Sequence, residues 1–408
     1  MHVDHLSLTN FRNYGRLELS LPLGATLLYG QNAQGKTNLL EAIFYLATTR
    51  SPQAEQDQQL INWEALQTAD PIVVGRLKAQ ISAHEQTQEL ELRLIRESRQ
   101  RQVSFRREAL INRRKVRLMD LLGTLRVVLF RPQDIELITG SPSQRRRYLD
   151  ITLCQIDPIY CRALSQYNKI VEQRNALLRQ LAEGAGSRDL LTVYDERVVE
   201  LGSQVFMRRA AFCDQIAREA QRIHYEALTD GAESMRLHYL PRLDDGDSRR
   251  AAALREAGEW MRAQQDDKTA VTTAFQEALS AARDQDVARG ATSIGPHRDD
   301  WQLLVNGRSL SAYGSRGQQR SAILALKLAE ITWMADVTGE TPILLLDEVV
   351  AELDEQRRAL LLQYVQTATQ SLLTATDPGM FTPTFLDQAT SMRVENGRVL
   401  ADNQEQVV

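Results

Sequence analysis

Hydrophobic and polar residues alternate in two stretches near the start of the chain, and a third stretch there is almost entirely apolar. The first two, residues 3–8 and 17–23, flank a polar turn and predict two antiparallel strands. Residues 25–29 have the length and composition of a buried strand. From 39 to 46 the apolar residues recur at helical spacing. The pattern therefore predicts a strand, a loop and a helix in that order.

Further along, the pattern predicts more strands and then two long helices. Residues 73–81, 89–95 and 103–111 are strand-like. A helix is expected after Pro142, with Ser143 as its N-cap. Apolar residues then recur three and four apart over 160–181 and 191–223, on either side of a glycine-containing turn. This region is predicted to be an inserted helical domain built on an antiparallel helix hairpin.

The last part of the chain returns to strands and shorter helices. Residues 301–305 form a predicted strand, and Asn306-Gly307 is a strong signal for a two-residue hairpin turn. An apolar helix is expected from about residue 316, and 343–347 reads as a buried strand that ends in Asp347 and Glu348. The predicted fold class is α/β, with domain boundaries at 1–140, 141–289 and 290–408.

The loop between the third strand and the first helix has the sequence G-x-x-x-x-G-K-T, a complete phosphate loop. Its glycines let backbone N–H groups and the helix N-terminus face phosphate oxygens. Lys36 supplies a positive charge to the terminal phosphates, and the Thr37 hydroxyl is a ligand for Mg²⁺. The predicted ATP contacts of this stretch are Gly30, Gln31, Asn32, Ala33, Gln34, Gly35, Lys36, Thr37 and Asn38.

Two further motifs complete this chemistry. Ligands bind at the carboxyl ends of strands in α/β sheets, so Asp347 is predicted to hold the Mg²⁺ and Glu348 to orient or deprotonate the attacking water. Ser315, Gly317 and Gln318 open a helix and form a second anion site. One ATP does not need two such sites in one subunit, so this one is expected to contact the ATP of another protomer. ATP-binding-cassette ATPases are arranged in this way.

Composition and charge narrow the functional classes. The chain has 408 residues, a net charge of −4 and three cysteines without a C-x-x-C pair. These features, with no signal peptide and no membrane-length apolar run, predict a reduced, cytoplasmic protein. Between Arg93 and Arg131, however, twelve Lys and Arg face only three acids. This stretch either binds a nucleic-acid backbone or is a solvated face whose arginines pair with acids elsewhere in the fold.

The motifs together resemble the RecF family of bacterial recombination proteins over essentially the whole chain. The family-like segments are residues 8–14, 130–134, 140–150, 295–300 and 314–320. The resemblance implies an ABC/SMC-like P-loop ATPase head with an inserted helical lobe, using ATP and Mg²⁺. By position it adds Arg12 and Asn13 to the ATP site and Gln133 as a candidate metal contact. Arg316 departs from the residue that many relatives carry in the signature segment. Thr376 stands where cassette ATPases usually carry a switch histidine.

The resemblance also implies a function. The protein would act in recombinational gap repair, replication restart and the SOS response. It would form an ATP-dependent homodimer and bind single-stranded and gapped duplex DNA. Partners would be RecR and RecO, and indirectly RecA. Weak DNA-stimulated ATP hydrolysis would drive release, and no nuclease activity is expected. The alternatives are an architectural SMC-type ATPase, which needs a far longer coiled coil, and a transporter motor subunit, against which the long helical insertion stands.

Overall fold

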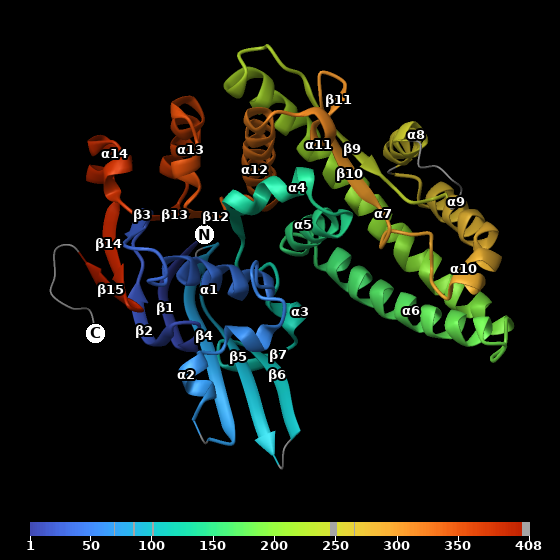
Figure 1. Ribbon diagram of the computed structural model, residues 1–408, viewed down its shortest axis with the longest axis horizontal. Helices are drawn as coiled ribbons and strands as arrows, with labels where there is room; N and C mark the ends of the chain where they lie inside the picture. Colours follow the sequence, from blue (N-terminus) through green and yellow to red (C-terminus); the bar gives the residue numbers. More distant parts are fainter. Residues whose placement is uncertain (69, 85, 100–101, 245–250, 265, 402–408) are drawn as a thin grey trace. The chain divides into compact units, whose positions relative to one another are not determined.

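A computed structural model describes residues 1–68, 70–84, 86–99, 102–244, 251–264 and 266–401 (Figure 1). The chain divides into two compact units, each described here by itself. Unit 1 consists of Met1–Asp134 and Glu330–Val408, and unit 2 is Ile135–Ala329. The second boundary, between Ala329 and Glu330, falls within the long helix α12 (Arg316–Thr338).

Unit 1 contains a six-stranded antiparallel sheet in the order β2-β1-β4-β5-β6-β7. Its strands alternate buried and exposed side chains, as expected for a sheet with one covered face. The β1–β2 hairpin confirms the first two predicted strands, and β4, β5 and β6 confirm the next three. The bounds are β1 (His2–Phe11), β2 (Tyr14–Ser20), β4 (Ile72–Ala83), β5 (Gln86–Arg99), β6 (Gln102–Ile111) and β7 (Arg114–Val116).

The second sheet of unit 1 has the order β15-β14-β3-β13-β12-β8, and all its pairings are parallel except that of β15 with β14. Strands β12 and β13 are buried along their whole length, as is usual for parallel strands. Their carboxyl ends meet at one edge, beside the start of helix α1 (Lys36–Thr48). The bounds are β3 (Gly24–Tyr29), β8 (Val127–Phe130), β12 (Ile343–Asp347), β13 (Gln370–Ala375), β14 (Thr390–Glu395) and β15 (Arg398–Ala401).

Short elements complete unit 1. They lie between the strands or after them along the chain. The α-helices are α2 (Trp63–Leu66), α3 (Leu118–Leu121), α13 (Glu355–Thr367) and α14 (Pro383–Gln388), and the 3₁₀ turns are Asp57–Leu60, Pro132–Ile135, Val349–Glu352 and Pro378–Met380.

Unit 2 is mainly helical and confirms the predicted hairpin. Helices α6 (Pro158–Ala182) and α7 (Asp189–Ile223) pack along each other, and α7 continues into a π-helical turn, His224–Leu228. The preceding helix α5 (Pro142–Cys154) has Ser141 as its N-cap, so the prediction of Ser143 was wrong. The Ser141 N–H is held by the Gln144 side chain, which fixes the helix start two residues earlier. The other helices are α4 (Glu136–Thr139), α8 (Ala251–Ala263), α9 (Lys268–Ala281), α10 (Arg283–Arg289) and α11 (Leu310–Tyr313).

A three-stranded sheet, β11-β10-β9, belongs to unit 2 as well. Strand β9 (Met235–Leu240) pairs with β10 (Asp300–Val305), and β11 (Arg308–Ser309) follows the predicted Asn306-Gly307 turn. Because β10 pairs with a strand of the helical region, residues 290–329 group with unit 2, whereas the predicted boundaries assigned them to the head. The units thus divide the chain at other points than 140 and 289, and the head-and-insertion assignment stays a prediction.

Buried ion pairs hold the loop at 295–300 inside unit 2. Arg209 on α7 is 1% exposed and contacts Asp299 at 2.7 Å and Asp150 at 2.6 Å. Arg174 on α6 is fully buried between Asp195 and Asp286, both at 2.7 Å. Charges removed from water in this way must be paired to be tolerated. Arg209 therefore holds the family-like segment 295–300 inside unit 2 through Asp299.

Candidate nucleotide site

The phosphate loop (residues 30–37) joins β3 to α1 and needs glycine at both of its fixed glycine positions. Gly30 has φ 146° and Gly35 has φ 118°, conformations that L side chains rarely adopt. A Cβ at Gly30 would collide with the Val394 carbonyl oxygen, and one at Gly35 would lie 2.7 Å from the Tyr14 hydroxyl. The glycines therefore allow close packing as well as the backbone curl.

Lys36 lies inside this loop. Its side chain is 3% exposed, and its Nζ donates to the carbonyl oxygens of Gly30 at 2.7 Å and Gln31 at 3.0 Å. The same Nζ lies 3.3 Å from the Glu348 carboxylate. Glu348 itself is 40% exposed and has a left-handed backbone, φ 52°, with its N–H bonded to the Thr374 hydroxyl. The structure thus brings together the two residues predicted to be catalytic, and they form an ion pair.

Thr37 and Asp347 meet across 310 residues of sequence. The Thr37 hydroxyl donates to Asp347 Oδ1 at 2.7 Å, and the Thr374 hydroxyl donates to the same oxygen at 2.9 Å. Asp347 is 8% exposed. Its burial raises the pKa of the carboxyl above its ordinary value, although the two hydroxyl hydrogen bonds oppose that shift. A largely buried carboxylate beside a hydroxyl is an oxygen donor set of the kind that Mg²⁺ prefers.

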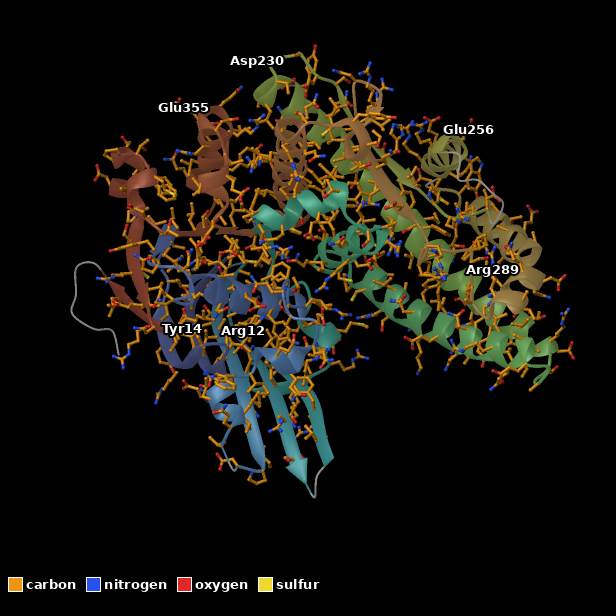
Figure 2. The ribbon with its side chains drawn as sticks, in the orientation of Figure 1. Arg12, Tyr14, Asp230, Glu256, Arg289 and Glu355 are labelled. Atoms are coloured by element: carbon orange, nitrogen blue, oxygen red, sulfur yellow. The ribbon has the colours of Figure 1, made fainter. Side chains whose placement is uncertain are left out.

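Arg12 and Asn13 occupy the turn between β1 and β2 (Figure 2). Arg12 makes a bidentate pair with Glu41, at 2.7 and 2.9 Å, so its guanidinium is engaged within unit 1. Asn13 donates to the Gln34 carbonyl at 2.9 Å and accepts from Asn38 at 2.7 Å. In this structure both residues support the phosphate loop and its helix, and their contact with ATP stays a prediction.

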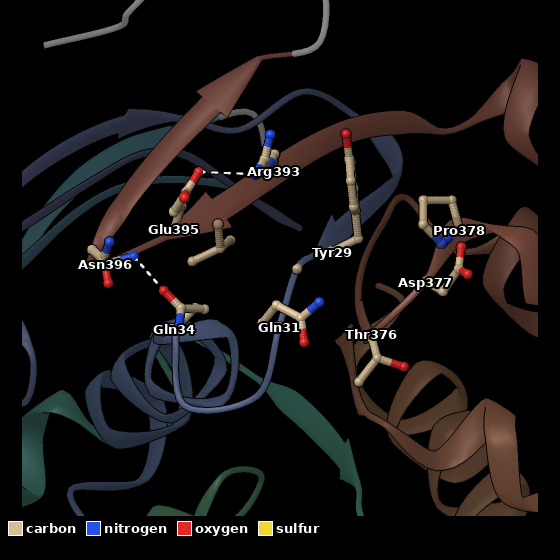
Figure 3. Close-up of a pocket in the computed structure, with 11 residues that line it drawn as sticks. Tyr29, Gln31, Gln34, Thr376, Asp377, Pro378, Arg393, Glu395 and Asn396 are labelled. Carbon is tan, nitrogen blue, oxygen red and sulfur yellow. Dashed lines mark hydrogen bonds and ion pairs between the residues drawn. The ribbon is translucent and has the colours of Figure 1, made fainter.

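A second turn, between β14 and β15, supports the loop from the C-terminal part of the chain. Asn396 N–H donates to Gln34 Oε1 at 2.6 Å, and Gly397 N–H donates to the Gln34 carbonyl at 3.1 Å. Figure 3 shows the pocket of about 520 Å³ that opens here, lined by the start of the phosphate loop, residues 376–378 and residues 393–396. Thr376, at the position of the usual switch histidine, is part of this lining.

The remaining predicted residues of unit 1 are accessible. Gln31, Asn32 and Ala33 are exposed at the tip of the loop. Gln133 is exposed on the 3₁₀ turn that follows β8, whose residue Phe130 is in register with Leu346 of β12. Gln133 therefore follows a strand that ends at the same sheet edge as Asp347. Its role as a metal contact stays a prediction.

The signature segment (residues 315–318) belongs to unit 2. Ser315, Arg316 and Gly317 are exposed at the start of α12. The Ser315 N–H donates to Gln318 Oε1 at 2.9 Å, and the Gln318 N–H donates to Ser315 Oγ at 3.2 Å. The structure brings Lys36, Thr37, Asp347 and Glu348 together within unit 1, and the contact of Ser315 with the ATP of another protomer stays a prediction.

Several cations of the basic stretch (residues 93–131) pair with acids elsewhere in the fold, as the second of the two predicted alternatives requires. Arg107 pairs with Asp57, Arg126 with Glu340 and Arg113 with Glu89, all acids outside the 93–131 window. Arg106 and Lys115 share Glu108 within it. Arg101 and the side chain of Arg99 lie outside the described residues. The exposed cations are concentrated around the β6–β7 turn, at Arg113, Arg114, Lys115 and Arg117.

Several supporting residues were not predicted from the sequence. Glu41 holds Arg12, and Thr374 holds both Asp347 and Glu348. Glu41 is one helical turn beyond Thr37, in the apolar face of α1. A single acid among apolar residues could have indicated that it pairs with a buried cation. Thr374 follows three apolar or small residues of a buried strand, and nothing in that pattern indicates that it contacts Asp347 or Glu348.

Comparison with known proteins places this geometry in a family. Residues 2–399 match the family described as RecF/RecN/SMC N terminal domain. The chain is 41% identical to the DNA replication and repair protein RecF of Chloroflexus aurantiacus, over 98% of this chain and 100% of that protein. It is 36% identical to the RecF protein of Bacillus subtilis, over 98% and 100%. The chain is a member of the RecF family.

Solved structures agree with this assignment. The structure of the recombination mediator protein RecF-ATPrS in the RecFOR pathway matches with a TM-score of 0.81 and 28% identity, over 98% of both chains. A Smc head domain derived from Pyrococcus furiosus matches with a TM-score of 0.50 and 16% identity, which shows the fold alone. The predicted ABC/SMC-like fold class is confirmed, and the chain is an ATP-binding DNA repair protein of the RecF type with the ATPase fold of that family. In the described part of the chain, no helix combines the length and apolar character needed to span a membrane.

Proposed function

We propose that this RecF family protein is an ATP-gated DNA clamp, in which ATP binding joins two copies and slow hydrolysis releases them. The observation that carries the proposal is the assembly of Lys36, Thr37, Asp347 and Glu348 at one sheet edge of unit 1. The exposed signature segment supports the second half, because it offers a hydroxyl and helix N–H groups to an anion that another protomer supplies.

The residues of unit 1 divide the chemistry among them. Lys36 exchanges its loop carbonyls and Glu348 for phosphate oxygens when ATP binds, since the Nζ is a strongly hydrated donor that must stay paired when buried. Thr37 and Asp347 would hold Mg²⁺, which neutralises charge on the phosphates. Glu348, released from Lys36, is then exposed enough to orient or accept a proton from the attacking water.

The proposal also covers the DNA and proteins that the chain would bind and where it would act. DNA would be bound through backbone contacts, and the exposed cations around the β6–β7 turn are the surface of unit 1 that suits such contacts. Single-stranded and gapped duplex DNA, RecR and RecO, and indirectly RecA are proposed partners because the relatives are RecF proteins. We also propose DNA stimulation of the ATPase, a cytoplasmic location and no cleavage of DNA.

The test is a mass measurement by size-exclusion chromatography with light scattering, with and without ATP and gapped duplex DNA. The proposal predicts a monomer without ATP, a dimer with ATP, and a dimer–DNA complex that ATP hydrolysis dissolves. A mass that ATP leaves unchanged would contradict the clamp. Intact DNA at the end of the incubation is expected, and shortened strands would refute the absence of nuclease activity.

A further inference from the structure

Glu233 connects the sheet of unit 2 to the signature segment. It lies between the π-helical turn His224–Leu228 and strand β9. Its carboxylate accepts a hydrogen bond from Gln318 Nε2 at 2.7 Å. Gln318 is in turn bonded twice to Ser315, through its side-chain oxygen and its backbone N–H. One carboxylate is therefore linked to the exposed serine through a single glutamine.

The carboxylate determines which way round the Gln318 amide lies. An ionised carboxylate only accepts hydrogen bonds, so the NH₂ group must face Glu233. The amide oxygen is then directed to the Ser315 N–H, as observed at 2.9 Å. With the amide turned over, its oxygen would face the carboxylate and its NH₂ group would face another N–H. A charge-assisted hydrogen bond thus selects one of two orientations.

The Gln318 backbone leaves the Ser315 hydroxyl able to donate. Ser315 Oγ already accepts the Gln318 N–H, at 3.2 Å. A hydroxyl has one hydrogen to donate and two lone pairs, so its hydrogen stays available to an acceptor outside the segment. A phosphate oxygen of a nucleotide is such an acceptor. The Gln318 N–H thus leaves the hydroxyl hydrogen available to an incoming phosphate, and the Glu233–Gln318 pair holds the Ser315 backbone that carries this hydroxyl.

Glu233 can do this because its own backbone is fixed. The adjacent Ser234 exchanges two hydrogen bonds with Asn306, both at 2.9 Å, at the β10–β11 turn. On the other side, the turn labelled by Asp230 in Figure 2 is closed by the bond from Gly231 N–H to the Tyr225 carbonyl at 2.7 Å. These bonds fix the chain on both sides of Glu233.

The signature segment is also held from its other side. The Leu310 carbonyl accepts from Gly314 N–H at 3.1 Å and from Gln319 Nε2 at 3.2 Å. A Cβ at Gly314 would lie 2.5 Å from this carbonyl oxygen, so the approach requires glycine. With α11 on one side and Glu233 on the other, the exposed segment is held in one conformation although solvent surrounds it.

We propose that Glu233 is a positioning residue for the signature segment: it orients Gln318, and through it Ser315, to meet the nucleotide bound by a second copy of this chain. The inference rests on the proposed function, because that function supplies the second copy and its nucleotide. Glu233 makes no contact with nucleotide in this account. Its effect is confined to dimer formation and to the order of residues 315–318.

The experiment compares Glu233→Ala, Gln318→Ala and the double variant by sedimentation with ATPγS. Each single variant should weaken the ATPγS-dependent dimer about tenfold or more, as expected for the loss of a hydrogen bond to a charged group. The double variant should be no weaker than Gln318→Ala, because Glu233 acts only through the Gln318 side chain. Glu233→Gln, whose amide oxygen still accepts, should recover part of the loss. Binding of a fluorescent ATP analogue to the Glu233→Ala monomer should stay within about twofold of wild type, because Glu233 has no proposed contact with nucleotide.

A matched control is Glu226→Gln, because Glu226 is a glutamate of the π-helical turn that precedes Glu233, 60% exposed and paired with Arg222 at 3.2 Å. It should dimerise like wild type. Amide hydrogen exchange of residues 315–321 in the nucleotide-free monomer should be faster in Glu233→Ala than in this control. Wild-type dimerisation by Glu233→Ala, or additive losses in the double variant, would overturn the inference.

The exchange measurement separates the two proposals. If the wild-type protein does not dimerise with ATPγS, the proposed function fails, and the positioning role in dimerisation fails with it. Unchanged exchange in Glu233→Ala would overturn the claim that Glu233 orders the segment, whatever the dimerisation result. Thermal unfolding of each variant, monitored by circular dichroism, establishes that it folds.

Discussion

The phosphate loop of unit 1 and the signature segment of unit 2 are prepared for anions in different ways. The loop is closed on itself: Lys36 is 3% exposed, and its donors are satisfied by loop carbonyls and Glu348. The signature segment is open: Ser315 and Gly317 are exposed, and the order of the segment comes from Gln318 and Glu233. The first must exchange internal partners to bind a phosphate, whereas the second already presents a hydroxyl.

This difference suggests a sequence of events. The loop can bind nucleotide within one protomer, because Asp347 and Glu348, which are predicted to act with Lys36 and Thr37, lie in unit 1 as the loop does. The signature segment acquires a ligand only when one is brought to it. Damage to the loop should therefore affect hydrolysis within each protomer, and damage to the signature segment should affect the joining of protomers.

The largest effect is expected for Lys36→Arg. A planar guanidinium cannot occupy the small space that the Nζ fills among the loop carbonyls, so ATP should still bind but hydrolysis should fall by about a thousandfold. Phosphate release and ATP-analogue binding measure the two effects. Lys78→Arg is the control, because Lys78 is a partly exposed lysine of the same unit paired with Glu89. Full hydrolysis by Lys36→Arg would remove Lys36 from the account.

A large effect on stability is expected for Arg209→Met in unit 2. The substitution leaves Asp299 buried without its cation, which should lower the free energy of unfolding by about 3–5 kcal/mol. Arg106→Met in unit 1 is the counterpart, because Arg106 is 52% exposed. It should cost under about 1 kcal/mol. Urea unfolding measures both. Similar losses of unfolding free energy in Arg209→Met and Arg106→Met would show that burial does not decide how much these ion pairs stabilise the protein.

His297 gives unit 2 a pH dependence. Burial chiefly lowers the pKa of His297 from 6.5 to about 4, and nearby Arg298, Arg146 and Arg174 add to the effect. Its ring accepts from or donates to Tyr167 and lies against the Thr292 carbonyl. Between pH 6.5 and 4 the unfolded chain binds a proton at His297 that the folded chain does not, so the contribution of His297 to stability falls as pH falls. Asp299 acts in the opposite direction, because burial raises its pKa from 3.8 to about 6. The loss from His297 should reach about 3 kcal/mol, and His297→Gln should reduce it. Urea unfolding at several pH values measures this, and an equal slope in the variant would contradict it.

The smallest effect is expected on the basic surface of unit 1. Most cations of residues 93–131 have acidic partners, but those around the β6–β7 turn are largely exposed and their ion pairs are therefore weak, so these cations should contribute most to DNA binding. Lys115→Ala should weaken DNA binding by only a few-fold and reduce the slope of log affinity against log salt by about one. Fluorescence anisotropy over a salt series measures the slope. An unchanged slope would place the DNA surface elsewhere.

The sequence predicted what is contiguous and missed what is assembled from distant residues. The phosphate loop is a single motif, and Asp347 could be predicted because buried parallel strands end at a common edge. Glu233 and Gln318 are 85 residues apart and share no spacing that a pattern could detect. The sequence left two interpretations of the basic stretch open because Asp57, Glu89 and Glu340, which neutralise part of it, lie outside its window. Residues 290–329 group with unit 2 because of a strand pairing that no local pattern encodes.

The most direct test of the account mixes two inactive variants. Lys36→Ala disables the loop and Ser315→Arg disables the signature segment. In a mixed dimer one composite site would carry both defects and the other would carry neither. The account predicts ATP-dependent mixed dimers with hydrolysis at roughly a quarter of the wild-type rate, since half of the dimers are mixed and each has one intact site. Each variant alone, at the same total concentration, is the control, because its homodimers contain no intact site. Hydrolysis in the two-variant mixture no higher than the sum of its components would contradict the claim that Ser315 acts on the nucleotide of a second copy.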